Sequence, residues 1–227
     1  MVRKVAVFLF CILLTASSVY GMDKSKHIGF SVWGGGFMSV SGKYNSEDKL
    51  SDWFGLYGFP AAELKYVIID KVALGVNAGY GYSPIKEGKK KELGPELKDQ
   101  TPALNIPFVS LNGTFNFGPM IKSEKNMLNP FVTIGVGSYS WYFAKNERTD
   151  KLPAPGDTTQ QFKTSSWGMN FGGGAEYFVT TKFSAFARLN YHLVMMKDEK
   201  KFGEDFGNQG FLTFGAGVTL YLFTGKR

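Results

Sequence analysis

Apolar side chains alternate with polar or small ones along the last stretch of the chain, between Phe211 and Phe223. A period of two predicts a β-strand with one apolar face. The run is longer than the common soluble strand of about five or six residues, and it suits a tilted membrane-spanning strand. The apolar face of this segment consists of Leu212, Phe214, Ala216, Val218, Leu220 and Leu222.

Seven earlier segments repeat this alternation, at residues 27–38, 61–68, 72–82, 104–117, 131–139, 166–179 and 183–193. The links between them alternate between long polar stretches and short ones such as Asp70 and Lys71. Alternating long and short connections are typical of barrels that span an outer membrane. The pattern therefore predicts an all-β fold, an eight-stranded antiparallel up-and-down transmembrane β-barrel, in which residues 211–223 pair with residues 28–38 and close the sheet.

The aromatic side chains on the apolar parity fall into two groups near the strand ends, as membrane interfaces favour. Tyr66, Phe117, Tyr177 and Phe183 lie near the short links, and Tyr80, Tyr82, Trp167 and Tyr191 lie near the long ones. Alternation does not by itself distinguish inside from outside. A soluble lipocalin-like barrel that carries a small apolar ligand in its cavity is therefore an alternative, with the two faces exchanged.

The first residues have the order of a secretory signal peptide. Arg3 and Lys4 precede the apolar run VAVFLFCILLTA, which is followed by SSVYG. The run is too short for a membrane-spanning helix of about 20 residues. We expect residues 1–21 to be a cleaved signal peptide and residues 22–227 to be the barrel domain. Cys11, the single cysteine, would leave with the signal, so the mature chain would hold no disulfide.

The charge balance argues against a nucleic-acid partner. The formal net charge is +7, from 26 basic and 19 acidic residues, and the lysines are interleaved with acids in polar segments. The charged loops would form either an ordinary solvated surface or a contact for anionic lipopolysaccharide, and the barrel wall is expected to contact outer-membrane lipid.

The signal peptide, the eight alternating segments and the ending FGAGVTLYLF resemble the small outer-membrane β-barrel family that includes OmpA and OmpX. The segment LNIPFVSL, with Pro107 inside a strand, is similar to an element of the broader outer-membrane β-barrel domain family. The resemblance implies a monomer in the cell outer membrane, with contact to the barrel-assembly machinery during biogenesis and a packed polar lumen. The sequence departs from the family pattern in one respect, because the tail TGKR follows Phe223.

The second parity of each strand lists the side chains expected inside a narrow lumen. Unpaired charges would be costly there. We therefore predict an internal polar network of Glu63, Lys65, Glu176, Arg188, Asn170, Asn190 and His192. Glu176 and Arg188, on neighbouring strands, are the expected direct ion pair. The network would form either a static polar core or, as an alternative, the gate of a narrow pore for small solutes.

The sequence predicts no catalytic site, cofactor or metal site. Catalysis by a small outer-membrane barrel needs a base and a nucleophile within hydrogen-bond reach, and only His27 and His192 are available. The segment NYHLVMM lacks the serine that follows the histidine by two residues in the lipid A deacylase family. A lipid-modifying enzyme remains a further alternative. Both histidines are expected to serve as hydrogen-bonding groups at the lumen or its rim.

Overall fold

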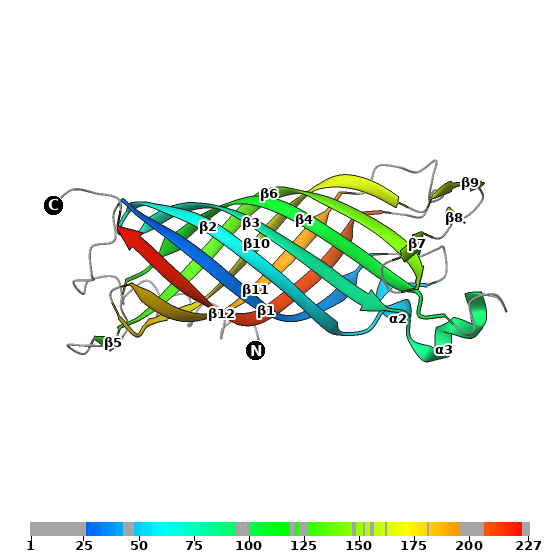
Figure 1. Cartoon of the computed structure of the whole chain (residues 1–227), viewed down its shortest axis with the longest axis horizontal. Helices are drawn as coiled ribbons and strands as arrows, with labels where there is room; N and C mark the ends of the chain where they lie inside the picture. The colour runs from blue at the N-terminus through cyan, green and yellow to red at the C-terminus, as the bar shows by residue number, and fades with distance from the viewer. Residues whose placement is uncertain are drawn as a thin grey trace, which may run out of the picture.

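Eight long antiparallel strands form a closed barrel in the computed structural model (Figure 1). The strands are β1 (His27–Ser41), β2 (Tyr57–Ile69), β3 (Val72–Pro84), β4 (Ala103–Asn116), β6 (Met127–Asn146), β10 (Lys163–Phe178), β11 (Phe183–Val194) and β12 (Gln209–Phe223). The structure describes residues 26–42, 48–93, 100–118, 121–122, 127–146, 149–151, 153–154, 157–161, 163–180, 182–195 and 207–223. The predicted signal peptide and the tail TGKR lie outside these residues.

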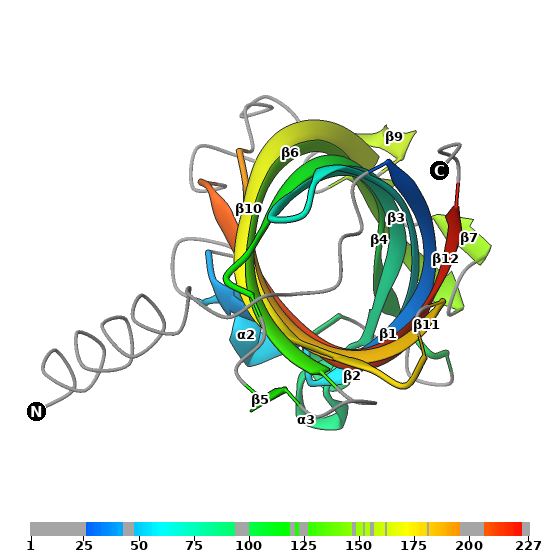
Figure 2. The same ribbon diagram turned by 90° about the vertical axis from the view of Figure 1, so that its left-hand side faces the viewer.

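Each of the eight long strands pairs with the next long strand along the chain, and one further pairing, between the first and the last, completes the ring seen end-on in Figure 2. β6 pairs with β10, and β1 pairs with β12 from His27 opposite Phe223 to Ser41 opposite Gly210. The prediction that the last strand closes the barrel on the first is therefore confirmed. Closure satisfies the backbone hydrogen bonds that a free sheet edge would leave open.

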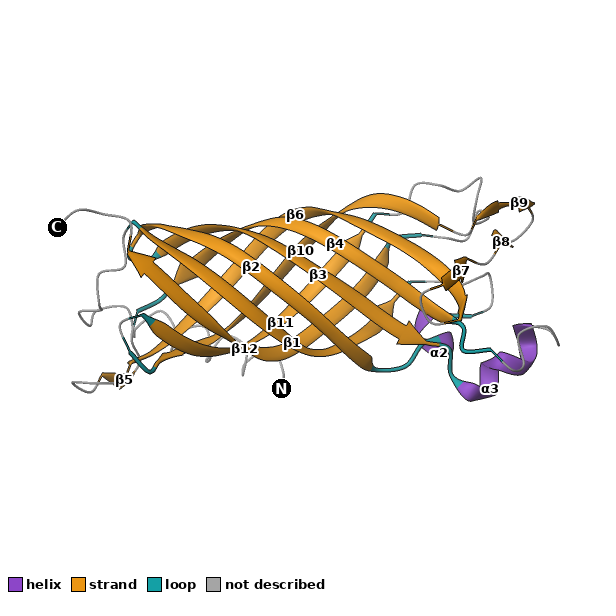
Figure 3. Ribbon diagram, in the orientation of Figure 1, coloured by secondary structure: helices purple, strands orange, loops and turns teal. Residues whose placement is uncertain are grey.

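The two ends of the barrel differ in the length of their connections. Two-residue and four-residue links join β2 to β3 and β10 to β11 at one end, which we call the short-turn end. The opposite, long-loop end carries α2 (Leu50–Trp53), α3 (Glu87–Lys90), the 3-10 helix η2 (Lys91–Leu93), and the short strands β7 (Thr149–Lys151), β8 (Pro153–Ala154) and β9 (Asp157–Gln161) (Figure 3). A further short strand, β5 (Ile121–Lys122), pairs with β6 at the short-turn end. No helix among the described residues is both long enough and apolar enough to cross a membrane.

The alternation along the strands corresponds to the two faces of the wall. The outward parity exposes a belt of large apolar side chains around the barrel, and the inward parity is buried. Ile134 is 62% exposed, whereas Thr133 beside it is 5% exposed. The belt includes Phe30, Val32, Leu64, Leu74, Val76, Val109, Leu111, Val132, Ile134, Val136, Phe171, Leu189, Val218, Leu220 and Leu222.

The structure corrects one expectation about the fourth segment and explains the composition of its start. Phe117 lies beyond the end of β4, and its side chain is buried against Phe115, so its predicted place among the outward aromatic residues is wrong. At the other end of β4, residues 103–106 are all buried. Burial on both sides explains why both parities are apolar there.

Candidate functional site

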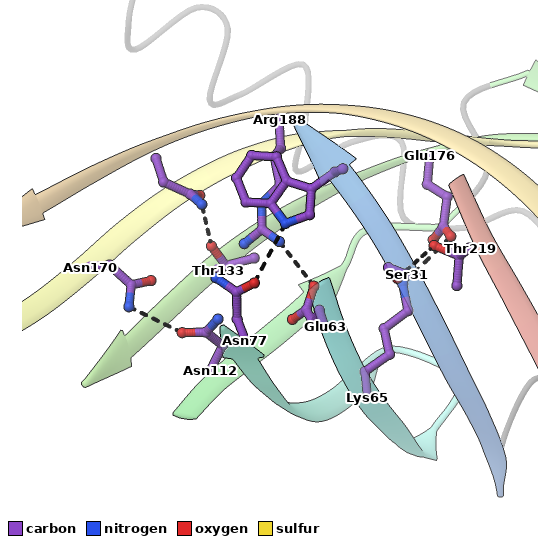
Figure 4. Close-up of polar contacts among 12 residues, drawn as sticks. Ser31, Glu63, Lys65, Asn77, Asn112, Thr133, Asn170, Glu176, Arg188 and Thr219 are labelled. Carbon is purple, nitrogen blue, oxygen red and sulfur yellow. Dashed lines mark hydrogen bonds and ion pairs between the residues drawn. The ribbon is translucent and has the colours of Figure 1, made fainter. Parts of the chain in front are cut away.

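A buried ion pair spans the middle of the lumen. Arg188 on β11 donates from Nη1 to Oε2 of Glu63 on β2 at 2.9 Å, and both side chains are almost fully buried (Figure 4). The Arg188 guanidinium also lies over the Trp33 ring, 4.6 Å from its centroid. Asn190 completes this group: when its amide oxygen faces the guanidinium, it accepts from Nε and Nη2, each at 3.1 Å.

A second ion pair lies nearer the short-turn end. Lys65 Nζ is 3.5 Å from Oε1 of Glu176. Glu176 also accepts hydrogen bonds from the Ser184 hydroxyl at 2.5 Å and from the Tyr221 hydroxyl at 2.8 Å. The carboxylate thus has several donors, which offset the cost of burying its charge.

The predicted direct pairing of Glu176 with Arg188 gives way to these two pairs. Arg188 stands opposite Gly174 in the ladder between β10 and β11, and Glu176 stands opposite Phe186. Each charge instead reaches a partner on β2, which supplies both Glu63 and Lys65. In a narrow barrel an inward side chain can meet one from a distant strand as readily as one from its neighbour.

Neutral hydrogen bonds link the other predicted lumen residues. Asn170 Nδ2 donates to Asn112 Oδ1 at 3.1 Å, and the side chains of Thr133 and Asn190 lie within hydrogen-bond distance, at 3.3 Å. His192 is 2% exposed, and its Nδ1 and Nε2 lie 2.9 Å from the Tyr139 hydroxyl and 3.0 Å from the Thr213 hydroxyl. All seven predicted network residues therefore point into the lumen and have polar partners.

Little free space remains around the ion pairs. A cavity of about 20 Å³ lies among them, which is room for about one water molecule. Its lining is Glu63, Lys65, Thr114, Asn116, Phe131, Thr133, Glu176, Phe186 and Arg188. Toward the short-turn end, a small apolar cluster follows, made of Val67, Ala73, Phe178 and Tyr221.

An apolar plug fills the lumen at the long-loop end. The plug consists of Leu50, Trp53 and Phe54, which lie in and just after α2, and each is at most 4% exposed. Phe54 packs against Phe143, with ring centroids 5.3 Å apart. The plug joins a cluster of buried side chains from the strands, among them Phe37, Ile106, Trp141 and Phe211.

Hydrogen bonds from the next long loop hold the plug in place. Lys86 N donates to the Trp53 carbonyl oxygen, and Lys86 Nζ donates to the Ser51 carbonyl oxygen, both at 2.8 Å. Asp48 accepts from Trp53 Nε1 at 3.0 Å and pairs with Lys89 Nζ at 3.4 Å. A hydrogen bond to Glu92, together with these acidic neighbours, raises the pKa of Lys89 above its usual value.

The plug is the part of the site that the sequence pattern did not predict, because it lies in a loop expected to be polar. The signal was present in the sequence as the cluster Leu50, Trp53 and Phe54 between polar residues. Three large apolar side chains spaced by three and one residues lie on one side of a helical turn, which α2 provides. Its first turn is stabilised by a hydrogen bond from Lys49 N to Asp52 Oδ2 at 3.1 Å.

The polar side chains in the middle of the lumen are ion-paired or hydrogen-bonded to one another. No group of three or more histidine, cysteine, aspartate or glutamate side chains within the described ranges is placed to hold a metal ion. His192 contacts Tyr139, Thr213 and Phe108, and its side chain is buried inside the lumen.

Comparison of the sequence with protein-family models and with curated proteins finds no match. Solved structures do match. The match to Neisserial surface protein A covers 88% of this chain and 98% of that protein's chain, with a TM-score of 0.52 and 10% sequence identity. The match to outer membrane protein OprG from Pseudomonas aeruginosa covers 88% of this chain and 98% of that chain, with a TM-score of 0.48 and 12% sequence identity. The match to the N-terminal β-barrel domain of OprF from the same organism covers 87% of this chain and 98% of that domain, with a TM-score of 0.46 and 15% sequence identity. The chain therefore has the fold of the small eight-stranded outer-membrane β-barrels, as its resemblance to the OmpA and OmpX family implied.

Proposed function

We propose that the chain is an integral outer-membrane barrel with a closed lumen, whose role is structural or is exerted through its loop surface, without catalysis. The observation that carries this proposal is the filling of the lumen at two levels. Buried ion pairs occupy its middle, and the plug of Leu50, Trp53 and Phe54 occupies its long-loop end.

The exposed apolar belt supports placement in a membrane. Side chains such as Ile134, Leu111 and Leu222 are each more than half exposed, whereas the charged side chains of Glu63 on β2 and Arg188 on β11 are buried inside the barrel. A soluble lipocalin-like barrel would have the opposite arrangement, with apolar side chains lining the cavity. In a bilayer the belt would face lipid, which removes the cost of exposing it to water.

Several finer proposals follow from this placement. The chain would reach the outer membrane through a cleavable signal at residues 1–21 and would be folded there by the barrel-assembly machinery as a monomer. Its outer rim would contact lipopolysaccharide. We place the long-loop end outside the cell, because outer-membrane barrels carry their longer loops there.

The lipid-modifying alternative receives no support from the histidine geometry. His192 is buried between Tyr139 and Thr213, so a lipid substrate at the rim would not reach its ring nitrogens. His27 begins β1 at the short-turn end.

Two measurements on the purified barrel test the proposal together. Heat-dependent gel mobility after extraction into detergent should report a folded barrel, and planar bilayers containing it should show little or no conductance. Large, stable single-channel openings would contradict the closed lumen and favour the narrow pore. Recovery of the whole protein in a soluble periplasmic fraction would contradict membrane placement and favour the lipocalin-like alternative.

A further inference from the structure

The wall between β2 and β3 is interrupted near the long-loop end. The ladder between these strands runs from Ile69 opposite Val72 to Ala61 opposite Gly79. It resumes only at a single bridge between Phe54 and Ile85. Residues 57–60 and 80–84, all within the described part of the chain, form no ladder pairs with each other, although each run pairs with its other neighbour.

We call this interruption the window, bounded by residues 57–60 of β2 and 80–84 of β3. Four residues of a strand span roughly 13 Å at about 3.3 Å per residue. Pro60 contributes to the interruption, because proline has no N–H to donate to a ladder. The window therefore reflects the sequence at a defined point of the wall.

An aromatic side chain lies at the window. By the alternation of β2, Tyr57 belongs to the inward set with Phe59 and Glu63, yet it is 50% exposed, whereas Phe59 is 3% exposed. The Tyr57 ring makes an edge contact with the ring of Tyr82, which has outward parity on β3, with centroids 4.9 Å apart. The Tyr57 ring is thus half exposed at the window and packs against Tyr82. Rotation about side-chain bonds can move such a ring without breaking backbone hydrogen bonds.

Apolar side chains line the inner side of the window. Phe59 packs edge-on against Trp33 at 4.6 Å between centroids. Phe37 lies close to β3 because Gly81 has no side chain, and a Cβ there would be 2.7 Å from the Phe37 ring. Further in, an apolar cavity of about 10 Å³ lies under the plug. Its lining is Leu50, Ile106, Tyr139, Trp141, Val194, Gln209 and Phe211, none of which is charged.

The plug and the window are mechanically connected. Phe54, a plug residue, forms the bridge that closes the top of the window, and only Gly55 and Leu56 separate it from Tyr57. Ser83 donates from its hydroxyl to the Gly55 carbonyl oxygen at 2.8 Å, which ties this connection to β3. Withdrawal of the plug would remove the upper edge of the window.

We propose that the window is a lateral entrance through which a single-chain anionic amphiphile inserts its hydrocarbon chain from the membrane and takes the place of the plug. The interior behind the window matches a hydrocarbon chain, because the outer part of the lumen is apolar. Lys86 matches an anionic head group, because its ammonium group binds the plug through the Ser51 carbonyl oxygen and would be released when the plug leaves. This proposal rests on the membrane placement proposed above.

Photolabelling of the barrel in phosphatidylcholine bilayers tests the entrance. The probe is a palmitic acid that carries a diazirine in its chain. We expect adducts at inward side chains behind the window, such as Phe211 and Trp141, as well as at the lipid-facing Ile134. Adducts confined to lipid-facing residues would overturn the window and leave the membrane placement standing. A lack of adducts at Ile134 would contradict the membrane placement, and the window with it.

Closing the window provides the matched control. Tyr57→Cys and Tyr82→Cys, joined by a short bifunctional thiol reagent, should abolish the internal adducts and leave those at Ile134 unchanged. The control pair is Phe171→Cys with Tyr191→Cys, two outward aromatic side chains in contact across a continuous ladder. Linking this pair should leave internal labelling intact. Cys11→Ser removes the only other cysteine. Internal labelling that survives the link at 57 and 82 would contradict lateral entry.

A comparison of a charged with an uncharged probe tests whether Lys86 binds the anionic head group. Lys86→Gln should reduce internal labelling by the palmitic acid probe several-fold and leave labelling by its uncharged methyl ester unchanged. An equal effect on both probes would show that Lys86 acts only by holding the plug, and would overturn the anionic specificity.

Discussion

Arg188 illustrates how one buried charge is accommodated in the lumen. Glu63 balances its charge, the Trp33 ring covers one face of its guanidinium, and Asn190 can accept from two of its nitrogens. With all of these partners present, the cost of burying the charge is nearly offset. Each member of the group, however, depends on the others for its own compensation.

Removal of one partner should therefore be costly. We predict that Arg188→Met destabilises the folded barrel by about 3–5 kcal/mol, because it leaves the Glu63 carboxylate buried without its cation. Urea-induced unfolding in lipid vesicles, followed by gel mobility, measures the change. A second substitution, Glu63→Leu, should recover much of the loss. The matched control is Glu87→Gln, which breaks an exposed ion pair with Lys90 and should cost less than about 1 kcal/mol. Equal losses for Arg188→Met and Glu87→Gln would contradict a dry, coupled pair.

At the scale of elements, the sequence predicted the strands and their faces well, because side chains in a strand alternate with an invariant period of two. Val76 and Asn77 differ by one position and lie on opposite faces, as expected. The cross-lumen partners were not predictable in the same way. Glu63 and Arg188 are 125 residues apart, and their meeting depends on the tilt and stagger of the closed barrel, which alternation does not specify.

The loop that carries α2 is the element that the sequence pattern described least well. Its apolar residues bury themselves in the barrel mouth, so tertiary packing determines its structure. Gly42 allows the chain to turn at the end of β1, with φ of 111°, and its carbonyl oxygen accepts from Leu50 N at 3.1 Å. The plug is therefore positioned by backbone contacts as well as by its apolar side chains.

Substitution of plug residues tests this role of the loop. We predict that Phe54→Ala costs about 3–5 kcal/mol of stability and releases the plug, because a fully buried aromatic side chain is lost. Trp53 fluorescence, isolated by subtracting the spectrum of a Trp53→Phe variant in each background, should shift to the red as the ring meets water. Leu56→Ala in the same segment is the control, since Leu56 is 59% exposed and should leave the spectrum unchanged. An unshifted Trp53 signal in Phe54→Ala would show that the plug does not depend on its own packing.

At the scale of the whole molecule, the plug and the ion pairs are barriers in series along one lumen. Conductance through a series of barriers is limited by whichever barrier remains, so removing one should leave the barrel closed. The ion pair of Glu63 with Arg188 lies in the middle of the lumen, and the plug lies at the long-loop end, so the two barriers can be removed independently.

Two barriers in series predict that the lumen conducts only when both are removed. Planar bilayers should show little conductance for a plug variant, Leu50→Ser with Phe54→Ser, and little for a lumen variant, Glu63→Ala with Arg188→Ala. The combined variant should show single-channel openings, because the plug and the central ion pair are both removed. Gel mobility must first confirm that each variant is folded. Openings in the plug variant alone would mean that the polar middle conducts and that the plug is the gate of a pore. A closed combined variant would place the decisive barrier among the side chains that remain, either Phe131 and Phe186 beside the ion pair or Phe178 and Tyr221 at the short-turn end.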